Sequence, residues 1–240
     1  MDLHDRGILI TGGGRGLGAA LARELARRGA RLLLVARSEP ELADTAAAIR
    51  AAGGTVATIA RDVADKDAVH AIAAAANAAL GAVDAVVHCA GALGPVPLRP
   101  LADTACEDLQ RALDVNLVGP FRLDKLLLGP MFLRGDGLVV HVSTDAAVAA
   151  YPLWGAYGVS KAAADHLARI WATELDGTGV RLLTIDPGEM DTRMHREAMP
   201  DADRSTLARP EAVAVRIADM MADPALASGA RLAAATWRQR

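Results

Sequence analysis

Tyr157 and Lys161 stand four residues apart in a stretch whose pattern predicts a helix. Residues i and i+4 share a helix face, so the phenol and the ammonium group can lie in one site. A neighbouring cation favours the phenolate and lowers the pKa of a tyrosine, which would make the pair a proton donor and acceptor. The same spacing also occurs on solvated helix faces, so the pair alone does not establish a site.

A glycine-rich segment near the N-terminus is a second candidate site. It lies between a short apolar run at 7–11, typical of a buried strand, and an amphipathic helical pattern at 19–28. Glycines in this position allow a tight turn and let backbone N–H groups approach a pyrophosphate at the positive end of a helix. A plain tight turn is the alternative. The candidate cofactor residues of this loop are Thr11, Gly12, Gly14, Arg15, Gly16, Leu17 and Gly18.

Basic residues near this loop favour a phosphorylated cofactor. Folds of this kind that prefer NAD usually carry an Asp or Glu at the end of the second strand, where it holds the ribose 2′-OH. Here the strand predicted over 31–36 is followed by Arg37 and Ser38, with no acid. Arg37 and Arg15 suit a 2′-phosphate, so we expect NADP(H) in preference to NAD(H). The alternative is that Arg37 is a solvated residue before the next helix.

Strands and helices alternate along the rest of the chain. Further strands are predicted over 55–60, 84–89, 137–142, 180–185 and 232–237. Further helices are predicted over 40–51, 65–80, about 104–128, from the Tyr157 segment to about 175, and over 210–221. The pattern Thr104 to Glu107 reads as a capping box. This alternation predicts an α/β fold of Rossmann type, a doubly wound parallel sheet of about seven strands with helices on both faces.

Two polar features fall where such a fold binds ligands. Ser143 and Thr144 follow the strand 137–142, and open α/β sheets bind ligands at the carboxyl ends of their strands. Pro120 lies four residues after Asn116 in a predicted helix, so the Asn116 carbonyl loses its hydrogen-bond donor and the helix should bend there. A kink without function is the alternative.

Length and composition bound the function. The 240 residues suit one domain over 1–240, in which the polar segment 189–207 would be a lid over the site. Net charge is −3 with both signs interspersed, which argues against a nucleic-acid partner. The two cysteines, Cys89 and Cys106, need no disulfide, and no apolar run is long enough for a signal peptide or membrane span. We therefore expect a reduced, cytoplasmic protein.

Taken together, these motifs resemble the short-chain dehydrogenase/reductase family in its short single-domain form, over roughly residues 5–222. The resemblance rests on the ordered set of the Thr11–Gly18 loop, Asp62-Val63, Asn116, the Tyr157/Lys161 pair and Pro187-Gly188 followed by Thr192. It implies that Asp62 and Val63 lie beside the adenine ring. It also implies that Pro187, Gly188 and Thr192 bind the nicotinamide and its carboxamide, and that the Asn116 carbonyl holds a water of a proton relay.

The sequence departs from the family pattern at two places near the site. Cys89-Ala90-Gly91 stands where the family has Asn-Ala-Gly, and the missing asparagine normally helps to hold the centre of the sheet. Cys89 is more simply a packed small residue than a nucleophile. The catalytic hydroxyl commonly lies thirteen residues before the tyrosine, which is Thr144 here, with Ser143 as the alternative. Ala90 and Gly91 complete the expected cofactor site.

The resemblance implies reversible hydride transfer between NADP(H) and an aldehyde or ketone, as in a carbonyl reductase. Tyr157 would give a proton to the alkoxide, Lys161 would lower the tyrosine pKa and bind the nicotinamide ribose, and Thr144 or Ser143 would orient the carbonyl oxygen. The expected wall of the substrate pocket is mainly apolar. It comprises Leu93, Pro95, Tyr151, Trp154, Met190 and Met194. His195 in the lid is either exposed or a contact for a polar substrate group.

Rival functions share parts of this pattern. A 3-ketoacyl-thioester reductase of the same family would want a basic patch near the entrance, and a non-catalytic NADPH-binding sensor would not need the Tyr–Lys–Asn set. A related epimerase or dehydratase would need a longer substrate region. We expect a small-molecule carbonyl or alcohol as substrate, no metal, no membrane partner, and a homodimer or homotetramer formed through the helices that carry Asn116 and Tyr157.

Overall fold

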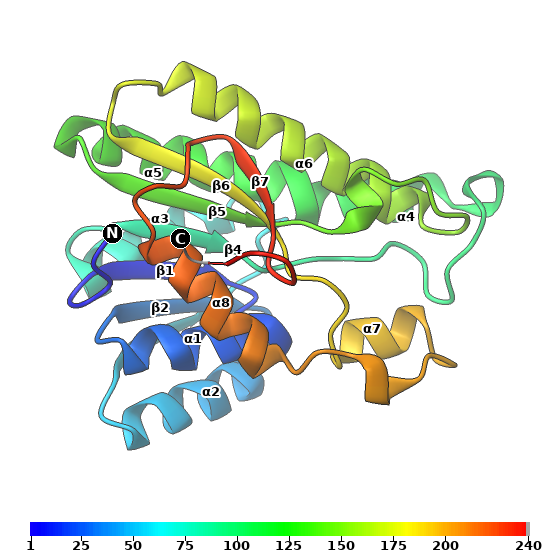
Figure 1. Cartoon of the computed structure of the whole chain (residues 1–240), viewed down its shortest axis with the longest axis horizontal. Coiled ribbons are helices and arrows are strands. Elements are labelled where there is room, and N and C mark those ends of the chain that lie inside the picture. The colour runs from blue at the N-terminus through cyan, green and yellow to red at the C-terminus, as the bar shows by residue number, and fades with distance from the viewer. Residues whose placement is uncertain (239–240) are drawn as a thin grey trace.

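Seven parallel strands form the centre of the computed structural model, which describes residues 1–238 (Figure 1). The strand order is β3-β2-β1-β4-β5-β6-β7. The strands are β1 (Gly7–Thr11), β2 (Arg31–Ala36), β3 (Thr55–Ala60), β4 (Ala85–His88), β5 (Gly137–Val142), β6 (Val180–Asp186) and β7 (Ala230–Ala233). The order reverses between β1 and β4, and a doubly wound sheet binds its ligand at such a reversal.

Helices cover both faces of the sheet, as Figure 1 shows. Those that carry the layers are α1 (Gly16–Arg27), α2 (Glu39–Ala51), α3 (Ala68–Leu80), α5 (Gly119–Arg134), α6 (Gly155–Glu174) and α8 (Pro210–Ala222). One core cluster joins α1, α2 and α8 to one face, and a second joins α3 and α5 to the other. The apolar runs of the central strands β1, β4 and β5 are nearly continuous because both faces of these strands are buried, whereas the edge strands β3 and β7 are partly exposed. The predicted α/β fold of Rossmann type is therefore confirmed.

The predicted helix over 104–128 is three segments. Helix α4 (Cys106–Leu113) passes into a π-helical turn (Asp114–Val118) and then into α5, which continues to Arg134. The break lies just before Pro120, whose ring cannot continue the regular ladder. The capping-box prediction is wrong, because Ala105 is the N-cap and the Thr104 hydroxyl donates to the Pro100 carbonyl instead.

The last strand also differs from its prediction. It runs over Ala230–Ala233 rather than 232–237, and residues 234–236 form a turn. Strand β7 is anchored at both ends, since Gly229 N–H donates to the Leu182 carbonyl and Ala234 N–H to the Asp186 carbonyl. This shift places Arg231, rather than a later residue, opposite Thr184 of β6.

Candidate active site

One cleft of about 1390 Å³ runs along the carboxyl ends of the strands, from the glycine loop to the segment after β6. The glycines give the backbone its shape there. Gly12 has φ +70°, and a Cβ on it would come 2.7 Å from the Ala90 nitrogen. A Cβ on Gly18 would collide with the Gly12 carbonyl oxygen. The loop thus packs α1 directly on β1 and leaves a bare backbone surface suited to a pyrophosphate.

Several guanidinium groups border the cleft, and three of them bear on the choice of cofactor. Arg15, Arg37 and Arg193 all line it. Arg15 lies 3.2 Å and Arg193 3.5 Å from the same Glu41 carboxylate oxygen, while Arg37 has no hydrogen bond or ion pair among the described residues. Arg193 comes from the short helix α7 (Arg193–Ala198), far along the sequence from the loop.

The residues expected beside an adenine ring are held in place by their neighbours. Asp62 accepts a 2.6 Å bond from Arg111 and a 3.0 Å bond from the Ala64 N–H. Burial opposes ionisation, but these bonds lower the pKa of Asp62 below its usual range. Val63 lines the cleft beside it. Ala90 and Gly91 line the cleft as well, whereas Thr11 lies beneath it and its hydroxyl accepts from the Ala90 N–H at 3.3 Å.

Helix α6 brings Tyr157 and Lys161 to the cleft, and both are buried. The Lys161 Nζ lies 5.8 Å from the centre of the Tyr157 ring and donates to the Val142 carbonyl at 2.8 Å. Burial lowers the pKa of Lys161 to about 8, against the attraction of the Asp165 carboxylate. The helix face predicted from the i, i+4 spacing is therefore buried, and Lys161 is a cation that can lose its proton near neutral pH.

The pKa of Tyr157 differs from the expectation that its lysine lowers it. Burial is the largest cause, and the carboxylates of Asp186, Asp145 and Asp165 add to it, so the pKa of Tyr157 is raised above its ordinary value. Lys161 is turned toward a backbone carbonyl rather than toward the phenol oxygen. Within the protein alone, Tyr157 is thus held as a protonated phenol, which can donate a proton.

The two candidate hydroxyls after β5 have different surroundings. Ser143 lines the cleft too, but it is buried and its hydroxyl donates to Asp165 at 2.8 Å. Thr144 lines the cleft, and its hydrogen bonding acts to lower the pKa of Tyr157. The Thr144 hydroxyl also donates to Asp145 and accepts from the Ala146 N–H. The geometry favours Thr144 as the hydroxyl that faces a substrate.

Asn116 lies beneath the cleft in the π-helical turn and is buried. Its side-chain amide donates to the Ala92 carbonyl and to Ser160 Oγ, both at 2.8 Å, and accepts from the Ala92 N–H at 2.9 Å. These bonds tie the loop after β4 to α6. The sequence pointed to the Asn116 carbonyl, and this bracing role of the side chain was missed.

The segment 189–207 covers one side of the cleft. Its ends are joined, since Asp191 N–H donates to the Ala208 carbonyl and Ala208 N–H to the Glu189 carbonyl. Arg204 makes two bonds to Asp191 within it. The segment includes α7, which the sequence did not predict, and Thr192 caps that helix by accepting from the His195 N–H.

Most expected pocket residues line the cleft. They are Leu93, Tyr151, Trp154, Met190 and Met194, together with Pro187, Gly188 and Thr192 of the expected nicotinamide segment. Pro95 is not among the residues that line the cleft. His195 is 11% exposed and lines the cleft, so of its two alternatives the exposed side chain is wrong and contact with a substrate stays a prediction.

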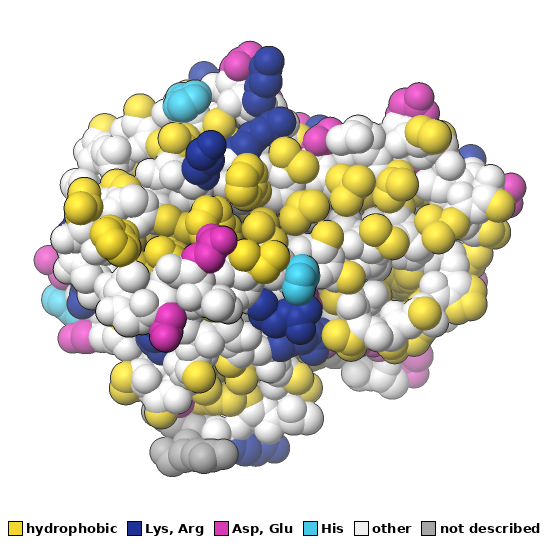
Figure 2. Space-filling model, turned by 90° about the horizontal axis from the view of Figure 1, so that it is seen from above, with side chains coloured by type: hydrophobic (Ala, Val, Ile, Leu, Met, Phe, Trp, Pro, Cys, Tyr) yellow, Lys and Arg dark blue, Asp and Glu magenta, His cyan; other side chains and the backbone are white. Residues whose placement is uncertain are grey.

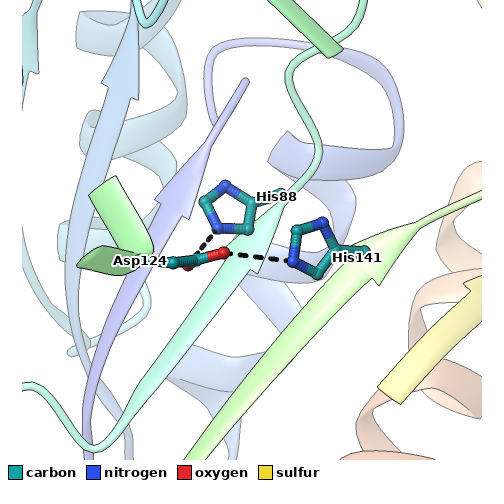
Figure 3. Close-up of side chains that lie close together, drawn as sticks. All are labelled: His88, Asp124 and His141. Atoms are coloured by element: carbon teal, nitrogen blue, oxygen red, sulfur yellow. Dashed lines mark hydrogen bonds and ion pairs between the residues drawn. The ribbon is translucent and has the colours of Figure 1, made fainter. Parts of the chain in front are cut away.

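Cys89 lies in the cleft but is not activated. Burial raises its thiol pKa to about 12, only partly offset by Lys161, so the thiol stays protonated. The sheet centre, which the asparagine at this position would hold in the family, is braced by other residues. His88 and His141 are paired in register on β4 and β5, and their Nε2 atoms lie 2.8 and 3.2 Å from the two oxygens of Asp124 on α5 (Figure 3).

This buried His–Asp–His cluster offers three possible metal-ligand atoms within 4.8 Å of one another. Its geometry suits hydrogen bonding better. Each imidazole meets a separate carboxylate oxygen, and the buried Nδ1 of His88 has no partner among the described residues. A His88 bound to metal through Nε2 would carry its proton on that Nδ1, where metal-binding histidines need an acceptor. We therefore treat the cluster as a structural brace.

Comparison with known proteins identifies the chain. Residues 6–203 match the family model described as short chain dehydrogenase. The chain belongs to the short-chain dehydrogenase family. Members of this family are oxidoreductases that act on CH–OH and carbonyl groups with a nicotinamide cofactor, and the backbone cradle around Gly12 and Gly18 fits such a group.

Individual relatives agree with this assignment. A short chain dehydrogenase of Pseudocercospora fijiensis is 35% identical over 195 residues, which are 80% of this chain and 62% of that longer protein. The 3beta-hydroxysteroid dehydrogenase 1 of Eggerthella lenta is 32% identical over 83% of this chain and 76% of its own. A structure of actinorhodin polyketide ketoreductase with NADPH is 26% identical, covers 95% of both chains and has a TM-score of 0.87.

Proposed function

We propose that this short-chain dehydrogenase is an NADP(H)-dependent reductase of aldehydes or ketones. The observation that carries the proposal is that Tyr157, Lys161 and Thr144 line the same cleft as the glycine loop and Arg37. A protonated phenol, a lysine with a lowered pKa and the Thr144 hydroxyl then face the place where a nicotinamide ring would end.

The residues of this chain divide the work of proton transfer and orientation. Bound NADPH would supply the hydride. Thr144 donates a hydrogen bond to the carbonyl oxygen and fixes its direction, an interaction that strengthens as negative charge develops. Tyr157 gives its proton to that oxygen, and its raised pKa keeps it protonated until the oxygen becomes basic. Lys161 stabilises the resulting phenolate, and Asn116 holds α6 against the loop after β4.

The preference for NADP(H) is supported by charge. Arg15, Arg37 and Arg193 border the cleft, and Glu41 forms ion pairs with Arg15 and Arg193 but not with Arg37. We expect Arg37→Ala to raise the KM for NADPH much more than that for NADH, because a guanidinium pairs with a 2′-phosphate and not with a hydroxyl. Equal effects on the two cofactors would assign Arg37 to the solvated surface.

The cleft wall supports a substrate with an apolar body. Leu93, Trp154, Met194 and Tyr151 line it, and the segment 189–207 acts as a lid over them in this proposal. The chain spans less than two thirds of the Pseudocercospora relative, so the substrates of such longer proteins are not transferred to it.

The test is oxidation of NADPH across aldehydes, ketones, diketones, hydroxysteroid ketones and 3-ketoacyl thioesters. Turnover of simple carbonyls supports the proposal. Turnover confined to thioesters would favour the ketoacyl reductase, an alternative that the similarity to a polyketide ketoreductase supports. Tight binding of NADPH without turnover of any compound would contradict the proposal and favour a cofactor sensor.

We also propose a homodimer or homotetramer. Hydrophobic side chains gather on the face seen from the side of α6 (Figure 2). On α5 and α6 the exposed ones include Phe121, Phe132, Val159 and Ile170. Contiguous apolar surface of this kind typically marks an interface, and light scattering on the purified protein measures the state directly. No helix of the described residues is long and apolar enough to cross a membrane.

A further inference from the structure

Arg231 connects the last strand to the residues around Tyr157. Its neighbours Ala230 and Leu232 pack into the core beneath α1 and α8, so the alternation along β7 directs Arg231 to the opposite face of the sheet. There it lies opposite Thr184 of β6, on the side covered by α6. The Arg231 side chain is 29% exposed, so most of it is covered by protein and its charge is stabilised by polar partners there.

Arg231 has three acceptors, and each belongs to a segment of the candidate active site. Its Nε donates to Asp165 at 3.1 Å, and its terminal nitrogen donates to the Thr144 backbone carbonyl at 2.7 Å. The same nitrogen lies 3.4 Å from Asp186, the residue before Pro187. One guanidinium thus joins α6, the turn after β5 and the end of β6. Its planar group directs several N–H donors at once, which the single ammonium of a lysine cannot do in the same geometry.

Asp165 is the centre of this network. It lies one turn beyond Lys161 and two beyond Tyr157 on the same buried face of α6. One of its oxygens accepts from both Ser143 and Arg231, and the other is buried with no partner among the described residues. A buried carboxylate with half its hydrogen-bonding capacity unused depends on the cation beside it.

We propose that Arg231 and Asp165 form a positioning pair for the reaction, which holds the Ser143-Thr144 turn against α6 and balances the negative charge beside Tyr157. This inference rests on the proposed function, because it assumes that Thr144 and Tyr157 face the substrate. Neither residue touches the reacting atoms. The C-terminal strand, which contributes no residue to the cofactor cleft, then acts on catalysis through Arg231.

The charges around the pair determine whether each substitution raises or lowers the pKa values of Tyr157 and Lys161. The groups that face Tyr157 and Lys161 are Asp165 on the same helix, Asp186 of β6, Asp145 after β5, His141 of β5, Cys89 after β4 and Arg231 of β7. Asp165 raises the pKa of both Tyr157 and Lys161. Asp165→Asn should therefore lower both pKa values, and Arg231→Met should raise both, because it leaves Asp165 and Asp186 without their cation.

Lysine NMR measures this effect without any substrate. The chain has three lysines, Lys66, Lys125 and Lys161, so a labelled sample in the Lys66→Arg/Lys125→Arg background reports Lys161 alone. We expect Lys161 to titrate at lower pH in Asp165→Asn and at higher pH in Arg231→Met. Arg238→Gln is the matched control, because Arg238 is exposed in the same C-terminal segment and, among residues 1–238, its side chain bonds only the Trp237 carbonyl.

Steady-state kinetics test whether Arg231 and Asp165 position the Ser143-Thr144 turn for the reaction. Arg231→Met should lower kcat by about tenfold or more, with little change in NADPH binding, and Arg231→Lys should recover part of it. The alkaline limb of the kcat profile should move in opposite directions in Arg231→Met and Asp165→Asn. If the wild type reduces no carbonyl, the proposed function fails. The NMR titration of Lys161 still tests the Arg231–Asp165 pair, because it needs no substrate. A titration of Lys161 and a kcat in Arg231→Met equal to those of Arg238→Gln would overturn the inference.

Discussion

The Asp124 cluster predicts how the protein responds to acid. Asp124 is fully buried between β4, β5 and α5, and although burial opposes it, His88 and His141 lower its pKa to about 2 from an ordinary 3.8. At ~1.4 kcal/mol for each pKa unit, ionised Asp124 contributes about 2 kcal/mol to the free energy of unfolding. Because its folded pKa is depressed, this contribution is present above about pH 4 and is lost as the pH falls toward about 2.

Asp124→Asn imitates the protonated carboxyl and should remove this dependence. We expect the variant to be less stable than wild type by about 2 kcal/mol near neutral pH and to converge with it in acid. Urea unfolding followed by circular dichroism at a series of pH values measures the difference. Asp44→Asn is the control, since Asp44 is exposed and makes no side-chain hydrogen bond or ion pair within the described residues.

His141 also makes the folded protein less stable as the pH falls, but at a higher pH than Asp124 does. Burial lowers its pKa below the ordinary 6.5, so the unfolded chain takes up a proton there before the folded chain does, and stability falls as the pH drops below about 6.5. His141→Asn should flatten that part of the curve. A stability difference between wild type and Asp124→Asn that stays constant from neutral pH to acid would refute the account of the cluster.

Three further substitutions test separate parts of the site. Gly18→Ala should abolish tight NADPH binding in equilibrium titrations, because a Cβ there collides with the Gly12 carbonyl that shapes the loop. Thr144→Val should lower kcat more than Ser143→Ala, since the Thr144 hydroxyl hydrogen-bonds with Tyr157 whereas the Ser143 hydroxyl donates to Asp165; the opposite order in steady-state assays would reassign the hydroxyl. Under an alkylating reagent at mildly alkaline pH, mass spectrometry should find exposed Cys106 modified well before Cys89, whose thiol pKa is about 12.

The sequence predicted the parts of the fold that depend on local pattern. Strands β1, β2, β3 and β5 begin and end where the sequence predicts. For β1, β2 and β5 the runs are mainly apolar because nearly all of their residues are buried, whereas β3 at the edge of the sheet is partly exposed. The π-helical turn could not be predicted, although Pro120 indicated where the α-helix is interrupted. Which hydrogen-bond pattern replaces the α-helical one depends on packing. The capping box predicted at Thr104 is wrong for a similar reason, because the Thr104 hydroxyl donates to the Pro100 carbonyl instead of capping the helix.

Residues that act across the fold could not be predicted. Arg231 and Asp165 lie 66 residues apart, and His88 and Asp124 lie 36 apart. Nothing in their local pattern links them, because each contact depends on strand order and register. A signal existed only for isolated polar residues in apolar segments, such as His141 within β5 and Asp165 within α6. The raised pKa of Tyr157 likewise follows from burial and from three carboxylates that chain order does not bring together.

Tyr157 is the proton donor of the proposed reaction. The most direct measurement is the single-turnover rate of carbonyl reduction by Tyr157→Phe with NADPH bound, next to its NADPH dissociation constant. Removing one oxygen from a buried ring leaves the packing against Trp154 in place. We predict unchanged cofactor binding and a rate reduced by about 10²-fold or more. A rate close to wild type at full cofactor occupancy would contradict the account.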